Sequence, residues 1–307
     1  MIGNGLIAFL ILLRPALRNK SALYLVAALT MANFVLCVIS LPYTTILVVG
    51  LKPGDPMATN FSSASIIYSS APFIGGTMVS SILTLGIAWD RLHALLRPVT
   101  YRSVNHMRQM IIFLVIGIIV GLIIMSINLI DGDIHRVNPG CAAGGCFWGE
   151  NFRIVWTVGA IIIKTMTTSC TIALMVKVRQ HQKNVLARQA ETGVSTEREE
   201  KAFMRANIVA VYVLVGSTMF VTVPFLVNGI STLAGPLVFK AIGPFVAYGV
   251  FCSAAFNVFV YGYKQRDIRH HLMAICGSKD ALQTISLPTT RFVTTTQRPS
   301  IFIPAVK

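Results

Sequence analysis

Long apolar runs separated by short basic segments dominate this chain of 307 residues. Seven runs carry at most one charged residue each, and they span residues 1–13, 21–51, 56–89, 109–130, 154–176, 206–239 and 241–263. A helix rises about 1.5 Å per residue and needs roughly 20 residues to cross a hydrocarbon core of about 30 Å. Six runs reach that length, so the pattern predicts an all-α membrane protein, a seven-transmembrane helix bundle.

The first run, 1–13, is too short for a full span, because thirteen residues reach about 20 Å. It has no basic segment ahead of its apolar part and no small-residue cleavage site before Arg14, so it is not a signal peptide. We interpret it as the inner half of a first helix. We therefore expect that an outer half-helix of about ten residues and an extracellular N-terminus precede it in the full gene product.

Composition and charge agree with a membrane protein. Only 12% of the residues are charged and 54% are hydrophobic, whereas about 25% charged is usual for soluble domains. Twenty-one of the 26 Lys and Arg residues fall in the segments 14–20, 91–108, 177–205 and 264–307. The positive-inside rule makes this side, with the C-terminus, cytoplasmic. The basic residues lie between apolar runs, which argues against nucleic-acid binding.

The opposite side carries two modification candidates. Asn60 begins the sequon Asn-Phe-Ser, which is compatible with a glycoprotein of the plasma membrane. Cys141 and Cys146 lie five residues apart in a Gly-rich loop. They could pair with each other, since such a loop can bring their Cα atoms within about 6 Å, or they could stay free.

Several function classes lack their sequence signals. The chain has no Gly-rich phosphate loop, HExxH motif or internal repeat, so we predict no enzyme, no metal and no cofactor. A transporter or channel, the main alternative, would show paired acids or broken helices in two related halves. An adhesion or scaffold protein is disfavoured by the short outer loops. What the chain does contain, within the runs or at their edges, is a set of isolated polar residues: Asn4, Asn33, Ser80, Asp90, Arg91, Lys164, Asn257 and Tyr261.

Most of these residues, all but Ser80 and Lys164, occur in motifs that resemble those of rhodopsin-like (class A) G-protein-coupled receptors. The motifs are Gly3-Asn4, Leu29-Thr30-Met31-Ala32-Asn33, Asp90-Arg91-Leu92, Pro224 in the sixth helix and Asn257-Val258-Phe259-Val260-Tyr261 in the seventh. Within that superfamily, two stretches are similar to nematode serpentine chemoreceptors: Gly86 to Leu92 with Pro98 and Tyr101, and the basic Arg266-Asp267-Ile268-Arg269 after the seventh helix. The resemblance implies a receptor that relays an extracellular chemical signal, carried by a small molecule or peptide, to a heterotrimeric G protein.

The resemblance also assigns roles at the inner side. Arg91 would meet the C-terminus of a G-protein α subunit, and Asp90 would neutralise it while the bundle is closed. Pro224 removes a backbone hydrogen bond, so the sixth helix should kink and can swing at its inner end. Asn257 and Tyr261 belong to the same switch. The alternatives are a simple edge charge at Arg91 and a static kink at Pro224.

The resemblance further predicts a polar network in the bundle centre, formed by Asn4, Asn33, Ser80 and Asn257. The related receptors often hold a sodium ion there with an acid in the second helix, at the position of Asn33. Asn33 carries no charge. We therefore expect a neutral hydrogen-bonded network with weak sodium dependence.

Ligand class is the least constrained property. Phe73 and Phe251 stand where amine receptors carry an acid and opsins carry the retinal lysine, which disfavours biogenic amines and light. Both phenylalanines are candidates for the ligand pocket, or else for core packing. Lys164 lies ten residues after Ile154 and thirteen before Lys177, too deep to reach either surface, so it points into the bundle. There it binds an anionic ligand or only hydrogen-bonds neighbouring hydroxyls and carbonyls.

The end of the chain predicts three further features. Residues 264–271 form a short amphipathic surface helix, and Cys276 beyond it is a candidate for S-palmitoylation or an idle thiol. We place the receptor domain at 1–276 and a disordered cytoplasmic tail at 277–307. The hydroxyl-rich tail could recruit an arrestin once phosphorylated, or it is merely flexible.

Overall fold

The computed structural model of the protein describes residues 2–18, 23–50, 61–135, 144–192, 198–234 and 245–275. All regular structure in these ranges is helical. The helices, in chain order, are α1 (Ile2–Leu13), α2 (Pro15–Arg18), α3 (Tyr24–Ile39), α4 (Leu41–Gly50), α5 (Ser63–Leu96), α6 (Pro98–Ser103), α7 (His106–Asp131), the 3-10 helix η3 (Gly144–Phe147), α8 (Glu150–Thr192), α9 (Arg198–Ser217), the π-helix η4 (Thr218–Thr222), α10 (Val223–Ala234), α12 (Phe245–Lys264) and α13 (Arg266–Ile275). Residues 1–269 form one compact unit, and the described part of the second unit, 270–307, is the end of α13.

The long apolar runs of the sequence correspond to the long helices. Among the described residues, five helical segments are long and apolar enough to cross a membrane: Ser63–Leu96, His106–Asp131, Glu150–Val185, Phe203–Ile230 and Phe245–Lys264. The pair α3 and α4 makes a sixth if it counts as one bent span, and α1 is a shorter apolar helix.

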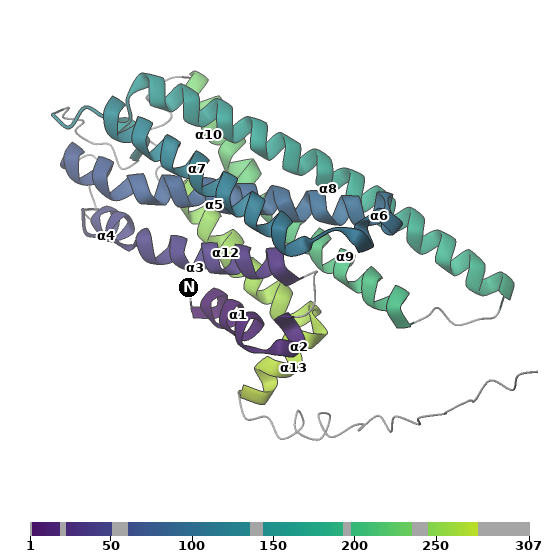
Figure 1. Ribbon diagram of the computed structural model, residues 1–307. Helices are drawn as coiled ribbons and strands as arrows, with labels where there is room; N and C mark the ends of the chain where they lie inside the picture. Colours follow the sequence, from purple (N-terminus) through teal and green to yellow (C-terminus); the bar gives the residue numbers. More distant parts are fainter. Residues whose placement is uncertain are drawn as a thin grey trace, which may run out of the picture. The chain divides into compact units, whose positions relative to one another are not determined.

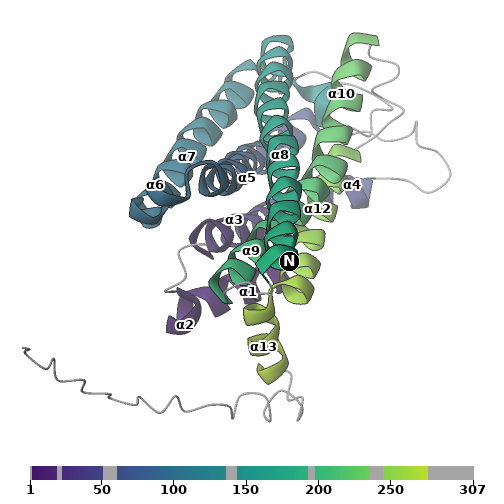
Figure 2. The same ribbon diagram turned by 90° about the vertical axis from the view of Figure 1, so that its right-hand side faces the viewer.

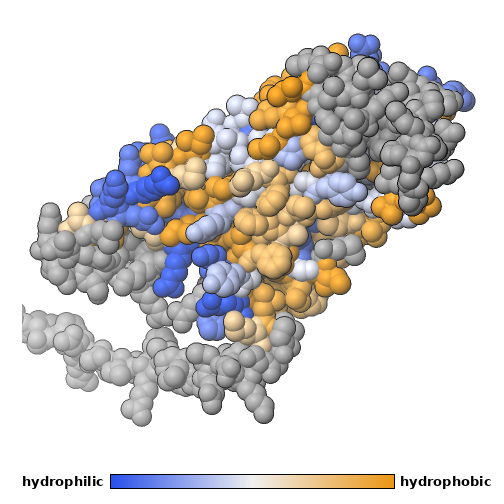
Figure 3. Space-filling view, turned by 180° about the vertical axis from the view of Figure 1, so that it is seen from behind, coloured by the Kyte–Doolittle hydropathy of each residue, from blue (hydrophilic) through white to orange (hydrophobic). Residues whose placement is uncertain are grey.

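Helix α5 occupies the centre of the bundle. It packs against α3, α7, α8 and α9, and Figures 1 and 2 show it running beside α7 and α8. Its buried positions lie all round the helix, whereas α7 buries only the narrow stripe of Gly117, Gly121, Ile124 and Asn128. The remaining surface of α7 is apolar and exposed, as expected of a helix that faces lipid. Figure 3 shows one face with hydrophobic side chains over its middle and hydrophilic ones toward its ends.

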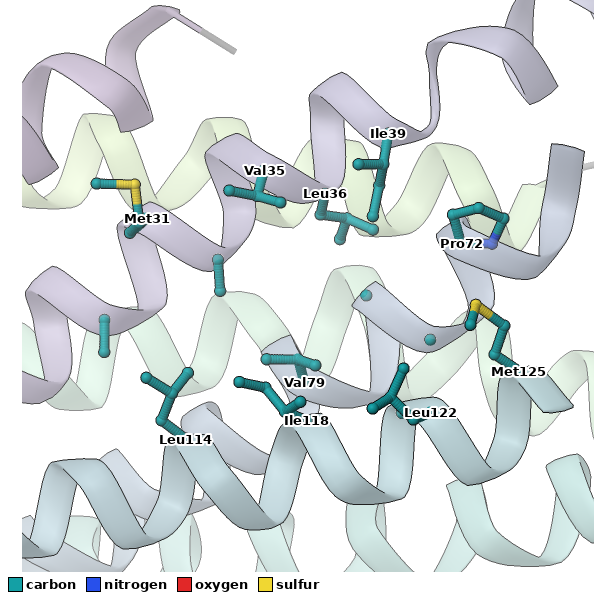
Figure 4. A pocket seen from close by; sticks show the side chains of 15 residues that line it. Met31, Val35, Leu36, Ile39, Pro72, Val79, Leu114, Ile118, Leu122 and Met125 are labelled. Carbon is teal, nitrogen blue, oxygen red and sulfur yellow. The ribbon is translucent and has the colours of Figure 1, made fainter.

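Two glycines bring α5 and α7 into backbone contact. A Cβ on Gly121 would lie 2.8 Å from the carbonyl oxygen of Gly75, and a Cβ on Gly75 would lie 3.1 Å from that of Gly121. Small residues at such a crossing let membrane helices approach closely. Beside the crossing, an apolar groove of about 500 Å³ separates α3 from α5 and α7. In Figure 4, Met31, Val35 and Leu36 of α3 line this groove across from α5 and α7.

The second span is bent by 43° where α3 meets α4. Pro42 lies just after the bend and has no N–H to donate, and its ring clashes with the preceding helical turn. The hydroxyl of Ser40 donates to the carbonyl oxygen of Cys37 at 3.0 Å, and Thr44 donates to the carbonyl oxygen of Ser40 at 3.0 Å. These bonds satisfy backbone groups around the break.

The sixth span contains a π-helical segment, η4, which ends at Thr222, two residues before Pro224. Proline cannot donate to the carbonyl four residues earlier, which here belongs to Phe220. That carbonyl faces Gly249 of α12, where an added Cβ would clash with it and would lie 3.1 Å from Cγ of Pro224. The absence of a side chain at Gly249 therefore lets α12 pack against the irregular turn of the sixth span.

Candidate functional site

At the predicted cytoplasmic end of α5, Arg91 and Asp90 form an ion pair. The guanidinium Nη2 lies 2.8 Å from Oδ2 of Asp90, and both side chains are buried. The helix continues to Leu96, beyond the Asp-Arg-Leu motif, because Pro98 disfavours helical geometry only at the residue directly before it. The pair therefore lies inside the last turns of α5.

Two residues from the following helices, α6 and α7, lie beside Asp90. The hydroxyl of Tyr101 in α6 donates to Oδ2 of Asp90 at 3.2 Å, and Nδ1 of His106, the first residue of α7, lies 3.6 Å from Oδ1. Their rings are packed with centroids 4.4 Å apart. Burial raises the pKa of Tyr101 to about 12, with the nearby Arg91 opposing this shift and Asp90 reinforcing it. In the sequence, Tyr101 stands out only as part of a motif, and His106 carries no signal of a contact with Asp90.

Four spans meet at a small cavity beside Arg91. Its lining comes from α3 and the residue before it, from α5 and α9, and from α12 and the residue after it. It consists of Leu23, Leu25, Val26, Ile87, Asp90, Arg91, Ala206, Val209, Ala210, Tyr261 and Gln265. Tyr261 is buried, and its hydroxyl has no hydrogen-bond partner among the described residues. The structure thus places Asp90, Arg91 and Tyr261 around one cavity. The wall contributed by α9 consists of small apolar side chains.

A second cavity lies deeper in the bundle and is polar. It is lined by Asn33, Thr77, Ser80, Ser81, Thr84, Lys164, Ser217, Val221, Val250, Ser253, Ala254 and Asn257. The hydroxyl of Ser80 donates to Oδ1 of Asn33 at 2.8 Å. Three residues of the predicted central network, Asn33, Ser80 and Asn257, therefore share this cavity. Ser81, Ser217 and Ser253 were not singled out from the sequence, because serine is common in membrane helices.

Asn4 reaches the same region because its side chain binds the backbone of α12. It is completely buried, and its Nδ2 donates to the carbonyl oxygen of Ala254 at 3.1 Å. Ala254 itself lines the polar cavity. This bond ties α1 to α12 one turn before Asn257, whose buried Oδ1 has no partner in the part of the chain that the structure describes.

Lys164 of α8 also reaches the polar cavity. Its Nζ donates to the hydroxyl of Ser81 at 2.8 Å and lies 5.6 Å from the ring centroid of Phe225. Its side chain is buried. The ammonium thus points into the bundle and meets a hydroxyl and an aromatic face, while both sequence alternatives, ligand contact and structural hydrogen bonding, stay open.

Away from the Asp90–Arg91 pair, the core of the bundle contains a group of aromatic side chains. Phe73 stacks on Tyr43 with ring centroids 5.6 Å apart and lies 6.0 Å from the ring of Phe251. Farther along the same core, Trp156 lies 5.7 Å from Phe225. The two phenylalanines proposed for ligand binding are therefore in contact with each other, from α5 and α12.

Several predicted features lie outside the described residues. They are Asn60, Cys141, Cys276 and the tail 277–307. Cys146 is disulfide-bonded, whereas Cys37, Cys170 and Cys252 are free thiols. The pairing of Cys146 with Cys141 stays a prediction. In the part of the chain that the structure describes, no three His, Cys, Asp or Glu residues are grouped to hold a metal ion.

Comparison with known proteins adds one finding to this geometry. Curated proteins give no match. The model of the serpentine-type 7TM GPCR chemoreceptor Srsx family, a nematode family, matches residues 1–276, which contain both cavities and the Asp90–Arg91 pair. The match confirms the receptor class and the all-α, multi-pass membrane fold that the motifs predicted. The chain belongs to the serpentine-type 7TM GPCR chemoreceptor family Srsx.

Proposed function

We propose that this chemoreceptor signals by releasing Arg91 from Asp90, so that the guanidinium can meet the α subunit of a heterotrimeric G protein. The observation that carries the proposal is the buried ion pair of 2.8 Å at a point where four spans converge. A guanidinium stays charged at all physiological pH values and makes strong directional hydrogen bonds to carboxylate or carbonyl oxygens. While Arg91 is paired with Asp90, its guanidinium cannot contact the G protein. Once the guanidinium is exposed, it can bind the α subunit.

The sixth span supplies the motion in this proposal. Its inner part, α9, covers Arg91 with Ala206, Val209 and Ala210. None of these side chains can hold Arg91 by a hydrogen bond or a charge. The π-segment and Pro224 interrupt the helix above, so α9 can tilt outward as a unit about that irregular turn. Outward tilt opens the cavity beside Arg91.

The ligand acts at the other end. We place the ligand site over the aromatic contact of Tyr43, Phe73 and Phe251, which joins α4, α5 and α12. A ligand that shifts these rings moves α12 against the sixth span, because Gly249 packs on the Phe220 carbonyl. The excess of Lys and Arg on one side supports a cytoplasmic C-terminus, and the seven apolar runs support residence in the plasma membrane.

The test is loss of coupling at equal surface expression. Cells expressing the wild type are screened with a panel of small organic acids, esters and short peptides in a G-protein dissociation assay, and an active compound is then applied to Arg91→Ala. We expect the variant to reach the surface and to lose at least about ten-fold in G-protein activation, since one charge-assisted contact is removed. Arg108→Ala, an exposed arginine near the start of α7, is the matched control and should signal normally. Equal signalling by Arg91→Ala and the wild type would overturn the proposal.

A further inference from the structure

The polar cavity contains a buried positive charge whose compensation is incomplete. Lys164 is 6% exposed, and of its three N–H groups one donates to Ser81. A buried charge is costly unless it is paired. The question is what neutralises the ammonium.

No acid in the described part of the chain can do so. Asp90 lies nine residues beyond Ser81 on α5, which is about 13 Å along the helix. Asp131 accepts hydrogen bonds from Phe152 and Asn151 at the first turn of α8, and Phe152 lies about 18 Å from Lys164 along that helix. The acids with described side chains therefore lie toward the two ends of the bundle, and Lys164 lies between them.

The α5 wall of the cavity offers the ammonium only acceptors. Thr77, Ser81 and Thr84 each donate their hydroxyl proton to a carbonyl oxygen of the preceding turn, at 2.7 to 2.8 Å. Their oxygens keep free lone pairs, and Ser81 uses one to accept from Lys164. This wall can hold the cation in place, but it supplies no negative charge.

The opposite wall offers donors. Ser217 at the end of α9 and Ser253 of α12 are buried, and a hydroxyl can rotate its proton toward a guest. Asn33 accepts from Ser80 through Oδ1, which leaves its amide N–H groups to donate. Asn257 adds a second amide. Hydroxyls and amides facing a buried ammonium form the usual environment of a small bound anion.

We propose that this cavity binds one small inorganic anion, chloride in physiological media, between the ammonium of Lys164 and the donors of Ser217, Ser253 and the two asparagines. The cavity volume of about 20 Å³ accommodates one guest of roughly water size. The site is separate from the aromatic ligand region, and it does not depend on which G protein the receptor uses.

The experiment measures binding on the purified full-length receptor in lipid nanodiscs, without ligand or G protein. The melting temperature is recorded while sodium chloride replaces sodium gluconate at constant ionic strength. A bound anion stabilises the folded state in proportion to the logarithm of its concentration above saturation of the site. We expect the melting temperature of the wild type to rise with chloride, and bromide to replace chloride.

Three variants assign the effect to the cavity. Lys164→Met should remove the chloride dependence, whereas Lys264→Met, the same change at an exposed lysine, should keep it. Ser253→Ala loses one donor and should raise the half-saturating chloride concentration by about three- to ten-fold, which keeps the test valid if Lys164→Met does not fold. The proposal is overturned if the wild type melts equally in chloride and gluconate, or if Lys164→Met and Ser253→Ala both retain the wild-type titration. Because no G protein is present, failure here leaves the signalling proposal untouched.

Discussion

Two buried cations in this receptor are stabilised in different ways. Arg91, near the C-terminal end of α5, has a carboxylate 2.8 Å away. Lys164, in the bundle centre, has a hydroxyl at 2.8 Å and an aromatic ring. The two side chains are nearly equally buried, so what distinguishes the two cations is the chemistry of their partners and not their exposure to solvent.

The chemistry of the two side chains explains why the partners differ. A guanidinium does not lose its proton in proteins, so a buried arginine needs a counter-charge at all times. Lysine holds a compact charge with three rotatable donors and tolerates neutral acceptors or a diffusible anion. In the two proposals above, Asp90 is a fixed partner that holds Arg91 while the bundle is closed. The anion beside Lys164 is an exchangeable partner that can leave when the bundle rearranges.

The largest effect is expected from Asp90→Asn. The substitution leaves the guanidinium buried without its carboxylate, and breaking a buried pair in this way costs about 3–5 kcal/mol. The closed state should lose stability, so basal G-protein activation should rise and the melting temperature should fall. Both are measured at matched surface expression without ligand. Asp133→Asn, an exposed acid near the end of α7, is the control. An unchanged basal signal would show that Asp90 does not restrain Arg91.

A smaller effect is expected at the other cation. Ser81→Ala removes the hydroxyl that accepts from Lys164, and losing one hydrogen bond of a buried charge costs about 1–3 kcal/mol. Ser126→Ala is the matched control, because its exposed hydroxyl bonds only to Leu122 of its own helix, at 2.9 Å. The melting temperatures of the purified variants should rank Ser126→Ala above Ser81→Ala and Ser81→Ala above Asp90→Asn. If Ser81→Ala were the least stable of the three, the two cations would not differ as argued.

The helical architecture could be predicted because length and hydrophobicity alone decide which segments can cross a membrane. The six long apolar runs became helices, while the bend between α3 and α4 was missed although Pro42 signals it. The π-turn before Pro224 was foreseen only as a kink. Its form depends on how α12 packs at Gly249, which a single helix does not encode.

The candidate sites were predictable as residues but not as contacts. Depth along its run placed Lys164 inside the bundle, yet its contact with Ser81 depends on the rotation of α8 against α5. His106 was missed because it follows a polar loop, where a histidine carries no pattern. His106 lies near Asp90 because the chain turns back on itself between α5 and α7.

The smallest effect concerns how Tyr101 supports the Arg91 latch. Its hydroxyl donates to Asp90, and Tyr101→Phe should cost about 0.5–1.5 kcal/mol at neutral pH. The pKa of Tyr101 is raised from 10.0 to about 12, so an unfolded chain ionises this side chain at a lower pH than the folded receptor does. Its contribution to stability is therefore complete below pH 10 and is lost as the pH rises toward 12. Melting temperatures of the wild type and Tyr101→Phe between pH 8 and about 11 test this, because the difference between the two proteins should shrink above pH 10. A difference that stays constant over the whole range would mean that the pKa of Tyr101 is the same in the folded and the unfolded protein. Equal melting temperatures at neutral pH would mean that Arg91 holds Asp90 without help from Tyr101.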